Sequence, residues 1–248
     1  MKSEVRELTS PLSLRNMTLA HGSNILLEDI NVSFRGNSLT ALIGRNGAGK
    51  STLLRQIAGL GPNMSDSVII EGRPQKEYSS IQLAKRISYV GTNRSVGRDL
   101  TLRQAVELGR APYTDWIGRL SHKDIKIVNE SMEMVGVSKF AERRLGTLSD
   151  GECQRAMIAR ALAQKTPILL LDEPTSFLDI PNRYAICQLL FKLAHEEGKT
   201  ILFSTHELDI ALKTCDYIAF ISTPNFYLLP AKEMEESGLL APLLSPIL

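Results

Sequence analysis

The feature that most constrains this chain is a glycine-rich loop that ends in a lysine and two hydroxyl residues. It reads Gly44-Arg45-Asn46-Gly47-Ala48-Gly49-Lys50-Ser51-Thr52 and fits the pattern G-x-x-x-x-G-K-[ST] of phosphate-binding loops. The apolar run at 39–43 favours a buried strand before the loop, and the run at 52–58 favours a helix after it. The sequence therefore predicts the strand, loop and helix in which such a loop folds around phosphate.

The residue types in this loop suit a bound phosphate chain. Glycines let the backbone turn tightly, so that several N–H groups face one anion, and the helix that starts near Gly49 adds the positive end of its dipole. We expect Lys50 to reach the β- and γ-phosphates and the Ser51 hydroxyl to hold Mg²⁺. The alternative is a glycine-rich turn with an exposed lysine, which the flanking strand and helix disfavour.

The composition indicates an ordinary globular protein. Hydrophobic residues make up 43% of the 248 residues and charged residues 23%, which argues against disorder. The net charge of +2 gives no reason to expect a nucleic-acid-binding surface. No apolar run approaches the roughly 20 residues of a membrane span, and the charged start at 1–7 lacks a signal-peptide core. Cys153, Cys187 and Cys215 are isolated, so we expect core or helix residues in a reducing cytoplasm, and neither a disulfide framework nor a zinc site.

The hydrophobic pattern predicts one α/β domain: a P-loop core with a mostly parallel sheet, an antiparallel β-subdomain and an inserted α-helical subdomain. Strands are expected at 12–19, 25–34, 67–70, 87–90, 168–171, 200–204 and 217–221, and helices at 80–86, 151–163, 182–197 and 207–215. Within 101–146, one helix face is predicted to carry Ile125, Val128, Met132 and Val135. The core is therefore expected at about 1–92 and 147–248 and the helical subdomain at about 93–146. The apolar tail 238–248 is expected to pack back on the domain, with an interface role as the alternative.

A second motif is an apolar strand that ends in two acids, at 168–173. A carboxylate at the C-terminal end of a strand, beside a phosphate-binding loop, is placed to orient Mg²⁺, which suits Asp172. Glu173 is then within reach of an attacking water as general base. Solvated acids that merely end a strand are the alternative, which the nearby loop disfavours.

Further stretches complete an order of motifs. Ser149 is a good N-cap for the helix that follows, and Leu148-Ser149-Asp150-Gly151-Glu152 resembles the LSGGQ signature of ATP-binding cassette (ABC) proteins. Ser176-Phe177-Leu178-Asp179 resembles their D-loop, and His206, at the end of the 200–204 strand, resembles their switch histidine. The chain thus resembles the nucleotide-binding subunit of an ABC transporter over nearly its whole length. The stretches 108–113 and 116–121 are similar to the branch that imports iron–siderophores, haem and cobalamin.

This resemblance implies a transport ATPase in which two copies pair head to tail. Each P-loop would bind ATP with Mg²⁺, while Ser149 and Gly151 of the other copy lie against the γ-phosphate. The implied cofactor-binding residues are 44–52, His21, Ser149, Gly151 and Asp179; the catalytic residues are Lys50, Glu173 and His206; the metal-binding residues are Ser51, Thr92 and Asp172. The implied partners are a second copy, transmembrane permease subunits and, indirectly, a substrate-binding protein, with no nucleic acid. The expected location is peripheral, at the cytoplasmic face of the cell membrane.

Three positions depart from the family pattern. Thr92 stands where the family usually has a glutamine that contacts Mg²⁺, so we expect weaker metal coordination, either through a water or by a shift that uses Asn93. Asp150 replaces a glycine near the partner's γ-phosphate, which costs electrostatic energy unless the carboxylate points away or is paired, with Arg155 as one candidate. His21 replaces an aromatic residue that stacks on adenine, and a solvent-exposed turn histidine is the alternative.

Other functions stay open at this point. A soluble ABC ATPase of DNA repair, translation or iron–sulfur assembly is disfavoured because the chain has one nucleotide domain and no coiled-coil insert. A weakly active nucleotide-binding module gains weight from the three departures. Tyr113 and Trp116 are expected either in a groove that receives a membrane-subunit helix or in the core of the helical subdomain.

Overall fold

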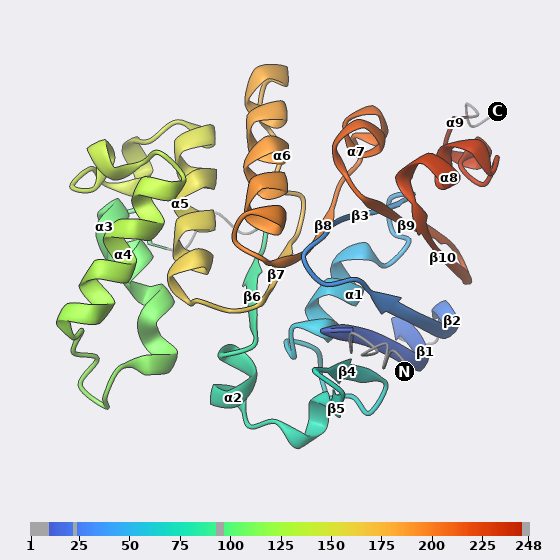
Figure 1. Ribbon diagram of the computed structural model, residues 1–248, viewed down its shortest axis with the longest axis horizontal. Coiled ribbons are helices and arrows are strands. Elements are labelled where there is room, and N and C mark those ends of the chain that lie inside the picture. The colour runs from blue at the N-terminus through green and yellow to red at the C-terminus, as the bar shows by residue number, and fades with distance from the viewer. Residues whose placement is uncertain (1–9, 22–23, 93–96, 245–248) are drawn as a thin grey trace, which may run out of the picture.

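The computed structural model describes residues 10–21, 24–92 and 97–244 of this chain. Within these residues the strands form two sheets, one antiparallel with the order β2-β1-β4-β5 and a larger one with the order β10-β9-β3-β8-β7-β6 (Figure 1). The strands are β1 Leu12–His21, β2 Asn24–Phe34, β3 Leu39–Gly44, β4 Val68–Ile70, β5 Arg73–Pro74, β6 Ile87–Val90, β7 Ile168–Leu171, β8 Thr200–Ser204, β9 Tyr217–Ser222 and β10 Asn225–Pro230.

The larger sheet decides where the functional loops lie. Strands β9, β3, β8, β7 and β6 pair in parallel, and β10 pairs antiparallel with β9 at the edge. The carboxyl ends of parallel strands meet at one edge of a sheet. Because β3, β8 and β7 are neighbours, the segments that follow them are brought together, and the predicted mostly parallel sheet is confirmed.

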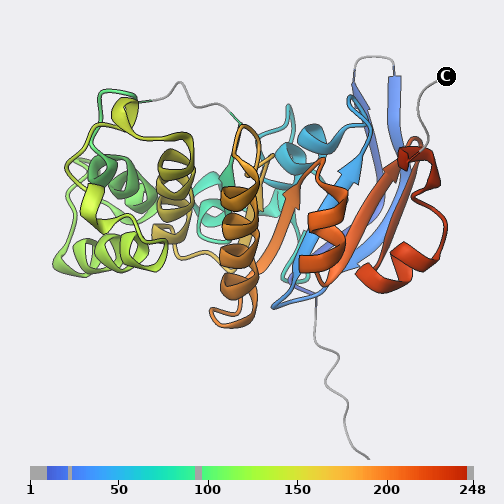
Figure 2. The same cartoon turned by 90° about the horizontal axis from the view of Figure 1, so that it is seen from above.

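The helices cover both faces of this sheet. They are α1 Lys50–Ile57, α2 Ser80–Ala84, α3 Leu102–Glu107, α4 His122–Met134, α5 Asp150–Ala163, α6 Ile180–His195, α7 Leu208–Thr214, α8 Ala231–Glu236 and α9 Ala241–Leu244, with 3₁₀ turns η1 Gln75–Glu77, η2 Leu108–Tyr113, η3 Ser138–Phe140 and η4 Leu145–Thr147. Helices α3, α4 and α5 gather at one end of an elongated molecule (Figures 1 and 2). None of the helices in the described residues is both long and apolar enough to cross a bilayer.

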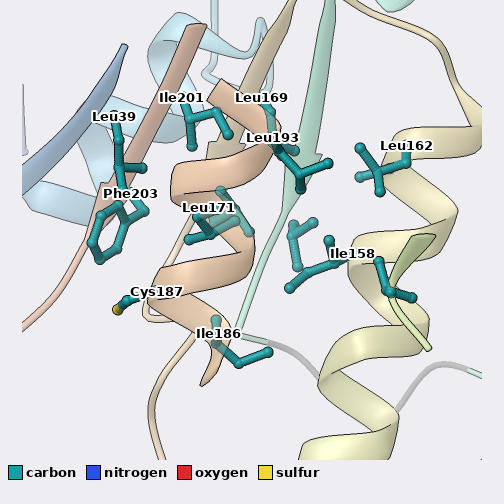
Figure 3. Close-up of a cluster of buried hydrophobic side chains, with 14 of the residues drawn as sticks. Leu39, Ile158, Leu162, Leu169, Leu171, Ile186, Cys187, Leu193, Ile201 and Phe203 are labelled. Carbon is teal, nitrogen blue, oxygen red and sulfur yellow. The ribbon is translucent and has the colours of Figure 1, made fainter. Parts of the chain in front are cut away.

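Alternation along the strands builds two hydrophobic cores. In β7, Leu169 and Leu171 face the core that α5 and α6 cover, whereas Ile168 and Leu170 face the core shared with α1 and the antiparallel sheet. Figure 3 shows the first core, where Phe203 from β8 lies near α6. Successive side chains of a strand point to opposite faces, so a strand buried on both faces is apolar throughout.

Local sequence signals explain several helix starts. Ser79, Thr101, Ser121 and Ser149 each begin a helix with a capping box, in which the N-cap side chain and the side chain three residues later satisfy each other's backbone N–H groups.

One sequence-based expectation about a helix face is wrong, and the structure adds a strand and a helix that were not predicted. Ile125 is 42% exposed, because the buried face of α4 centres on Val128 and Met132 and leaves Ile125 at its edge. Strand β10 and helix α8 were not predicted, because β10 is a partly buried edge strand without a clear apolar alternation. In the part of the tail that the structure describes, 238–244, the expected packing is confirmed. Leu240 is buried, and Leu239 and Leu243 pack against the core that α5 and α6 cover.

Candidate nucleotide site

The phosphate-binding loop connects β3 to α1, as the sequence predicts. Gly47 and Gly49 adopt φ values of +79° and +99°, which residues with a side chain rarely adopt. Lys50 is buried, and its Nζ donates to the carbonyl oxygens of Gly44 at 2.9 Å and of Arg45 at 3.2 Å. Burial lowers the pKa of Lys50 although two nearby carboxylates oppose the shift. The backbone of the loop therefore holds the Lys50 ammonium group in place through its own carbonyl oxygens.

Asp172 lies directly beside the first turn of α1. Its Oδ1 accepts hydrogen bonds from Ser51 Oγ at 2.9 Å and Ser204 Oγ at 2.7 Å, and its Oδ2 accepts one from the Tyr89 hydroxyl at 3.4 Å. Asp172 is 4% exposed, so these contacts replace water. A carboxylate and a hydroxyl at this distance suit Mg²⁺, which prefers oxygen ligands and shares its shell with phosphate and water. Ser51 and Asp172 are thus the residues that would hold it.

Tyr89 and Ser204 complete this carboxylate site, and the sequence analysis did not single them out. Burial, and then the charge of Asp172, raises the pKa of Tyr89 to about 12, so its hydroxyl remains a hydrogen-bond donor at physiological pH. Both residues end an apolar strand or lie near its end, and only the neighbouring positions of β6, β7 and β8 reveal their contact with Asp172.

Glu173 contacts His206 on the neighbouring strand end. His206 Nε2 lies 2.7 Å from Glu173 Oε1, and Ser176 Oγ donates to Oε2 at 2.8 Å. The Glu173 backbone adopts φ +49°, and its N–H donates to Ser204 Oγ at 2.8 Å. Burial opposes ionisation of Glu173, but the hydrogen bonds from Ser176 and His206 outweigh it and lower its pKa. Glu173 is therefore an ionised carboxylate that can accept a proton.

The P-loop, Glu173 and His206 face one cleft of about 410 Å³. Its lining residues are Asn24, Leu26, Asn46, Gly47, Gly49, Lys50, Ser51, Thr52, Glu173 and His206. Asn24 and Leu26 were not predicted; they enter because the β1–β2 hairpin pairs His21 with Asn24 beside the loop. The side chain of His21 lies outside the described residues, so its stacking role stays a prediction.

Other predicted site residues lie outside this cleft. Ser149 caps α5, where its Oγ lies 2.9 Å from Glu152 Oε2. Asp179 caps α6 and accepts from the Asn182 side chain at 2.7 Å. A Cβ on Gly151 would lie 3.4 Å from Asn182 Oδ1, so the starts of α5 and α6 adjoin. The structure thus groups Ser149, Gly151 and Asp179 on a surface of their own.

The three departures from the family pattern lie at exposed or undescribed places. Thr92 is exposed just beyond β6 and does not line the cleft, and Asn93 falls outside the described residues. Asp150 is exposed as the first residue of α5. Trp116 is 93% exposed, so core packing, one of the two alternatives for this residue, is wrong, whereas Tyr113 is 37% exposed.

This parallel sheet, with a P-loop, an acid-tipped strand and a histidine around one cleft, defines a P-loop nucleotide-binding domain. The profile of the family described as ABC transporter matches residues 27–176, which is more than half of the chain. The chain belongs to this family: it is an ABC transporter ATP-binding subunit and an ATPase.

Relatives and solved structures agree with this assignment. The chain is 35% identical to the petrobactin import ATP-binding protein FpuD of Bacillus anthracis, over 87% of this chain and 79% of that protein. It is 36% identical to the iron(3+)-hydroxamate import ATP-binding protein FhuC of Bacillus subtilis, over 84% and 77%. It is 39% identical to the cobalamin import ATP-binding protein BtuD of Halobacterium salinarum, over 79% and 49%.

Solved structures of ATP-binding cassettes have the same fold. A cassette in its ADP conformation superposes with a TM-score of 0.83 at 20% identity, covering 96% of this chain and 99% of that one. A dimeric cassette in a post-hydrolysis state, bound to ADP and phosphate, superposes with a TM-score of 0.74 at 29% identity, covering 89% and 98%. The P-loop core with its mixed β-structure and helices is therefore the ABC ATPase fold.

Proposed function

We propose that this ATPase drives the import of an iron–siderophore complex, haem or cobalamin through a membrane permease. The names of the relatives support this substrate class, because they describe import of petrobactin, iron(3+)-hydroxamate and cobalamin. The proposed location is peripheral, at the cytoplasmic face of the cell membrane, where permease subunits and indirectly a substrate-binding protein would be its partners. The proposed helical subdomain, about 93–146, would contact the permease.

The cleft supports hydrolysis of ATP by in-line attack of water. The P-loop N–H groups and Lys50 would bind the phosphates, and Ser51 and Asp172 would hold Mg²⁺, which supplies positive charge to the phosphate oxygens. Glu173 would accept the proton of the attacking water, and His206 would orient the Glu173 carboxylate and contact the γ-phosphate. The single observation that carries this proposal is the chain of contacts Ser51–Asp172–Ser204–Glu173–His206 around one cleft.

We infer that a second copy completes each site. Ser149 and Gly151 lie at the N-terminus of the fourteen-residue helix α5, where backbone N–H groups and a serine hydroxyl can bind an anion. They do not line the cleft of their own chain. The dimeric cassette bound to ADP and phosphate supports pairing of two copies. In our proposal the copies lie head to tail, and ATP shifts an equilibrium between open and closed dimers.

A second cavity, of about 460 Å³, suits a permease helix. We call it the α2–α5 groove; it is lined by Ala58, Gly59, Leu60, Met64, Ser80, Leu83, Ala84, Ile87, Tyr89, Arg160 and Gln164. Tyr113 adjoins it, because its hydroxyl donates to the Gln164 carbonyl at 3.0 Å. A largely apolar lining beside a partly exposed tyrosine is typical of protein interfaces.

ATPase assays of the wild type beside Glu173→Gln test the catalytic part of this proposal. A Mg-dependent rate that the substitution abolishes supports it, whereas equal low rates would favour the weakly active module. Thr92→Gln should preserve or raise the rate, and His21→Ala should weaken ATP binding if His21 stacks on adenine. Co-purification with a polytopic permease distinguishes a transport subunit from a soluble ABC ATPase.

A further inference from the structure

Tyr89 is a half-buried residue of β6 that touches two sites at once. Tyr89 lines the α2–α5 groove, and its hydroxyl lies 3.4 Å from Asp172 Oδ2. Within the described residues, Tyr89 is the group that hydrogen-bonds Oδ2, whereas Ser51 and Ser204 both bond Oδ1. One side chain therefore joins the groove to one oxygen of the proposed magnesium carboxylate.

The backbone reinforces this connection. The Asp172 N–H donates to the Val90 carbonyl at 2.8 Å, so the β6–β7 pairing continues to the carboxylate itself. A Cβ on Gly91 would lie 3.0 Å from Tyr89 Cε1, so the glycine leaves room for the ring to lie against the chain. The Tyr89 ring thus occupies a defined place, and a group that displaced it from the groove side would also displace its hydroxyl.

We propose that Tyr89 is a positioning residue that couples occupation of the α2–α5 groove to the orientation of Asp172, and so to metal binding. This rests on the proposed function, in which a permease helix occupies the groove. The coupling has a physical basis because a hydrogen bond weakens steeply when its geometry is disturbed. It also gives a route to the metal in a chain where Thr92 lacks the amide of the usual glutamine.

The effect of Tyr89 on the metal is measured with the full chain and two probes, Mn²⁺ and a non-hydrolysable ATP analogue. Electron paramagnetic resonance gives the Mn²⁺ affinity of the analogue-bound protein. We expect Tyr89→Phe to weaken it about 3- to 10-fold, the range of one modest hydrogen bond. The matched control is Tyr113→Phe, which removes a hydroxyl beside the same groove that does not touch Asp172, and it should leave the affinity within about 2-fold.

The reverse direction, from the metal site to the groove, is tested by observing the two tyrosines while Mg²⁺ and the analogue bind. In protein labelled with 3-fluorotyrosine, the ¹⁹F signals of Tyr89 and Tyr113 are assigned by their loss in the two variants. Because coupling is reciprocal, Mg²⁺ and the analogue should shift the Tyr89 signal and leave that of Tyr113 in place.

The possible results separate the inference from the proposed function. Equal Mn²⁺ affinity in the wild type and Tyr89→Phe, equal weakening in both variants, or a Tyr89 signal that does not move would each overturn the positioning role. A wild type that binds neither Mn²⁺ nor the analogue would overturn the proposed nucleotide site itself and this inference with it.

Discussion

His206 Nε2 lies 2.7 Å from Glu173 Oε1, although the two residues are 33 positions apart in the sequence. They meet because β7 and β8 are parallel neighbours, and because the Glu173 N–H donates to Ser204 Oγ, two residues before the histidine. The end of β8 therefore positions both members of the pair. A shift between these two strands would separate the carboxylate from the imidazole.

Replacing Glu173 with glutamine should abolish hydrolysis without loss of ATP binding. The amide keeps the shape of the side chain but cannot accept the proton of water, and general bases typically contribute about 10²- to 10⁴-fold to a rate. Steady-state phosphate release should fall at least about 100-fold. Equilibrium binding of ATP is the control, and a variant that still turned over ATP at the wild-type rate would contradict the role of Glu173.

The exposed ring of Phe177 should contribute to pairing of two copies. Phe177 is 80% exposed and has φ +64°, next to Ser176, which bonds the Glu173 carboxylate. Burying a phenylalanine contributes about 1.5–3 kcal/mol, so Phe177→Gly in a Glu173→Gln background should weaken ATP-dependent dimerisation at least about 10-fold.

Two controls accompany the Phe177 experiment, which is read by analytical ultracentrifugation. Trp116→Ala removes a more exposed aromatic side chain, in the segment between η2 and α4, and should leave dimerisation unchanged. The second control is the stability of the monomer, which should change little. Glycine relieves the strain of the positive φ at position 177 but raises the conformational entropy of the unfolded chain, and the two effects oppose each other. Dimers as tight as those of the parent chain would exclude an interface role for the ring.

Glutamine in place of Glu152 should tighten the closed dimer. Hydrogen bonds from the Ser149 backbone and hydroxyl lower the pKa of Glu152. The ionised Glu152 carboxylate is therefore bonded to the serine that is proposed to meet the partner's γ-phosphate. Two unit charges about 4 Å apart in water repel by about 1 kcal/mol, which predicts roughly a 5-fold gain in ATP-dependent dimerisation. The control is Glu130→Gln, on the exposed side of α4, which should have no effect. Weaker pairing in Glu152→Gln would show that the Glu152 carboxylate does not repel the partner's γ-phosphate.

The buried ion pair of the α3–α5 end should be essential for stability. Arg110 Nε donates to Asp124 Oδ1 at 2.8 Å, and the two side chains are only 5% and 10% exposed. Removing one partner leaves the other charge buried, which typically costs about 3–5 kcal/mol. Urea denaturation of Arg110→Met should show a loss of that size, and adding Asp124→Asn should recover part of it. A loss below about 1 kcal/mol would mean that water reaches Asp124.

Alkaline pH should destabilise the fold through its buried thiols. Burial raises the pKa of Cys187 from 9.0 to about 11, and it raises that of Cys215 further. Between pH 9 and 11 the unfolded chain has lost the Cys187 proton while the folded chain retains it, so the free energy of unfolding falls as pH rises. Cys187 alone should account for about 1 kcal/mol between pH 7 and 10. Cys187→Ala should lower this pH dependence by that amount; an unchanged slope would show that the thiol titrates normally.

Much of the candidate site was predicted from short stretches of sequence, and the exceptions share a cause. The loop at 44–52 and the acids at 172–173 carry their chemistry within consecutive residues, so spacing alone indicated it. Asn24, Tyr89 and Ser204 belong to the same sites, but each lies in an ordinary strand segment whose neighbours are set by pairing. The expectation that Ile125 is buried was wrong for a related reason. Periodicity indicates which face of a helix is apolar, but it does not tell how much of that face the neighbouring helices cover.

The sequence by itself determined the class of this protein, because glycine, lysine and carboxylate spacings dictate how a backbone can bind phosphate and metal. Only the tertiary structure decided which residues share a site. It placed Ser149 and Gly151 away from the cleft of their own chain and brought Tyr89 between the groove and Asp172. The physical reason is that strand order and register, which arise from long-range pairing and packing, decide contacts between residues far apart in the chain.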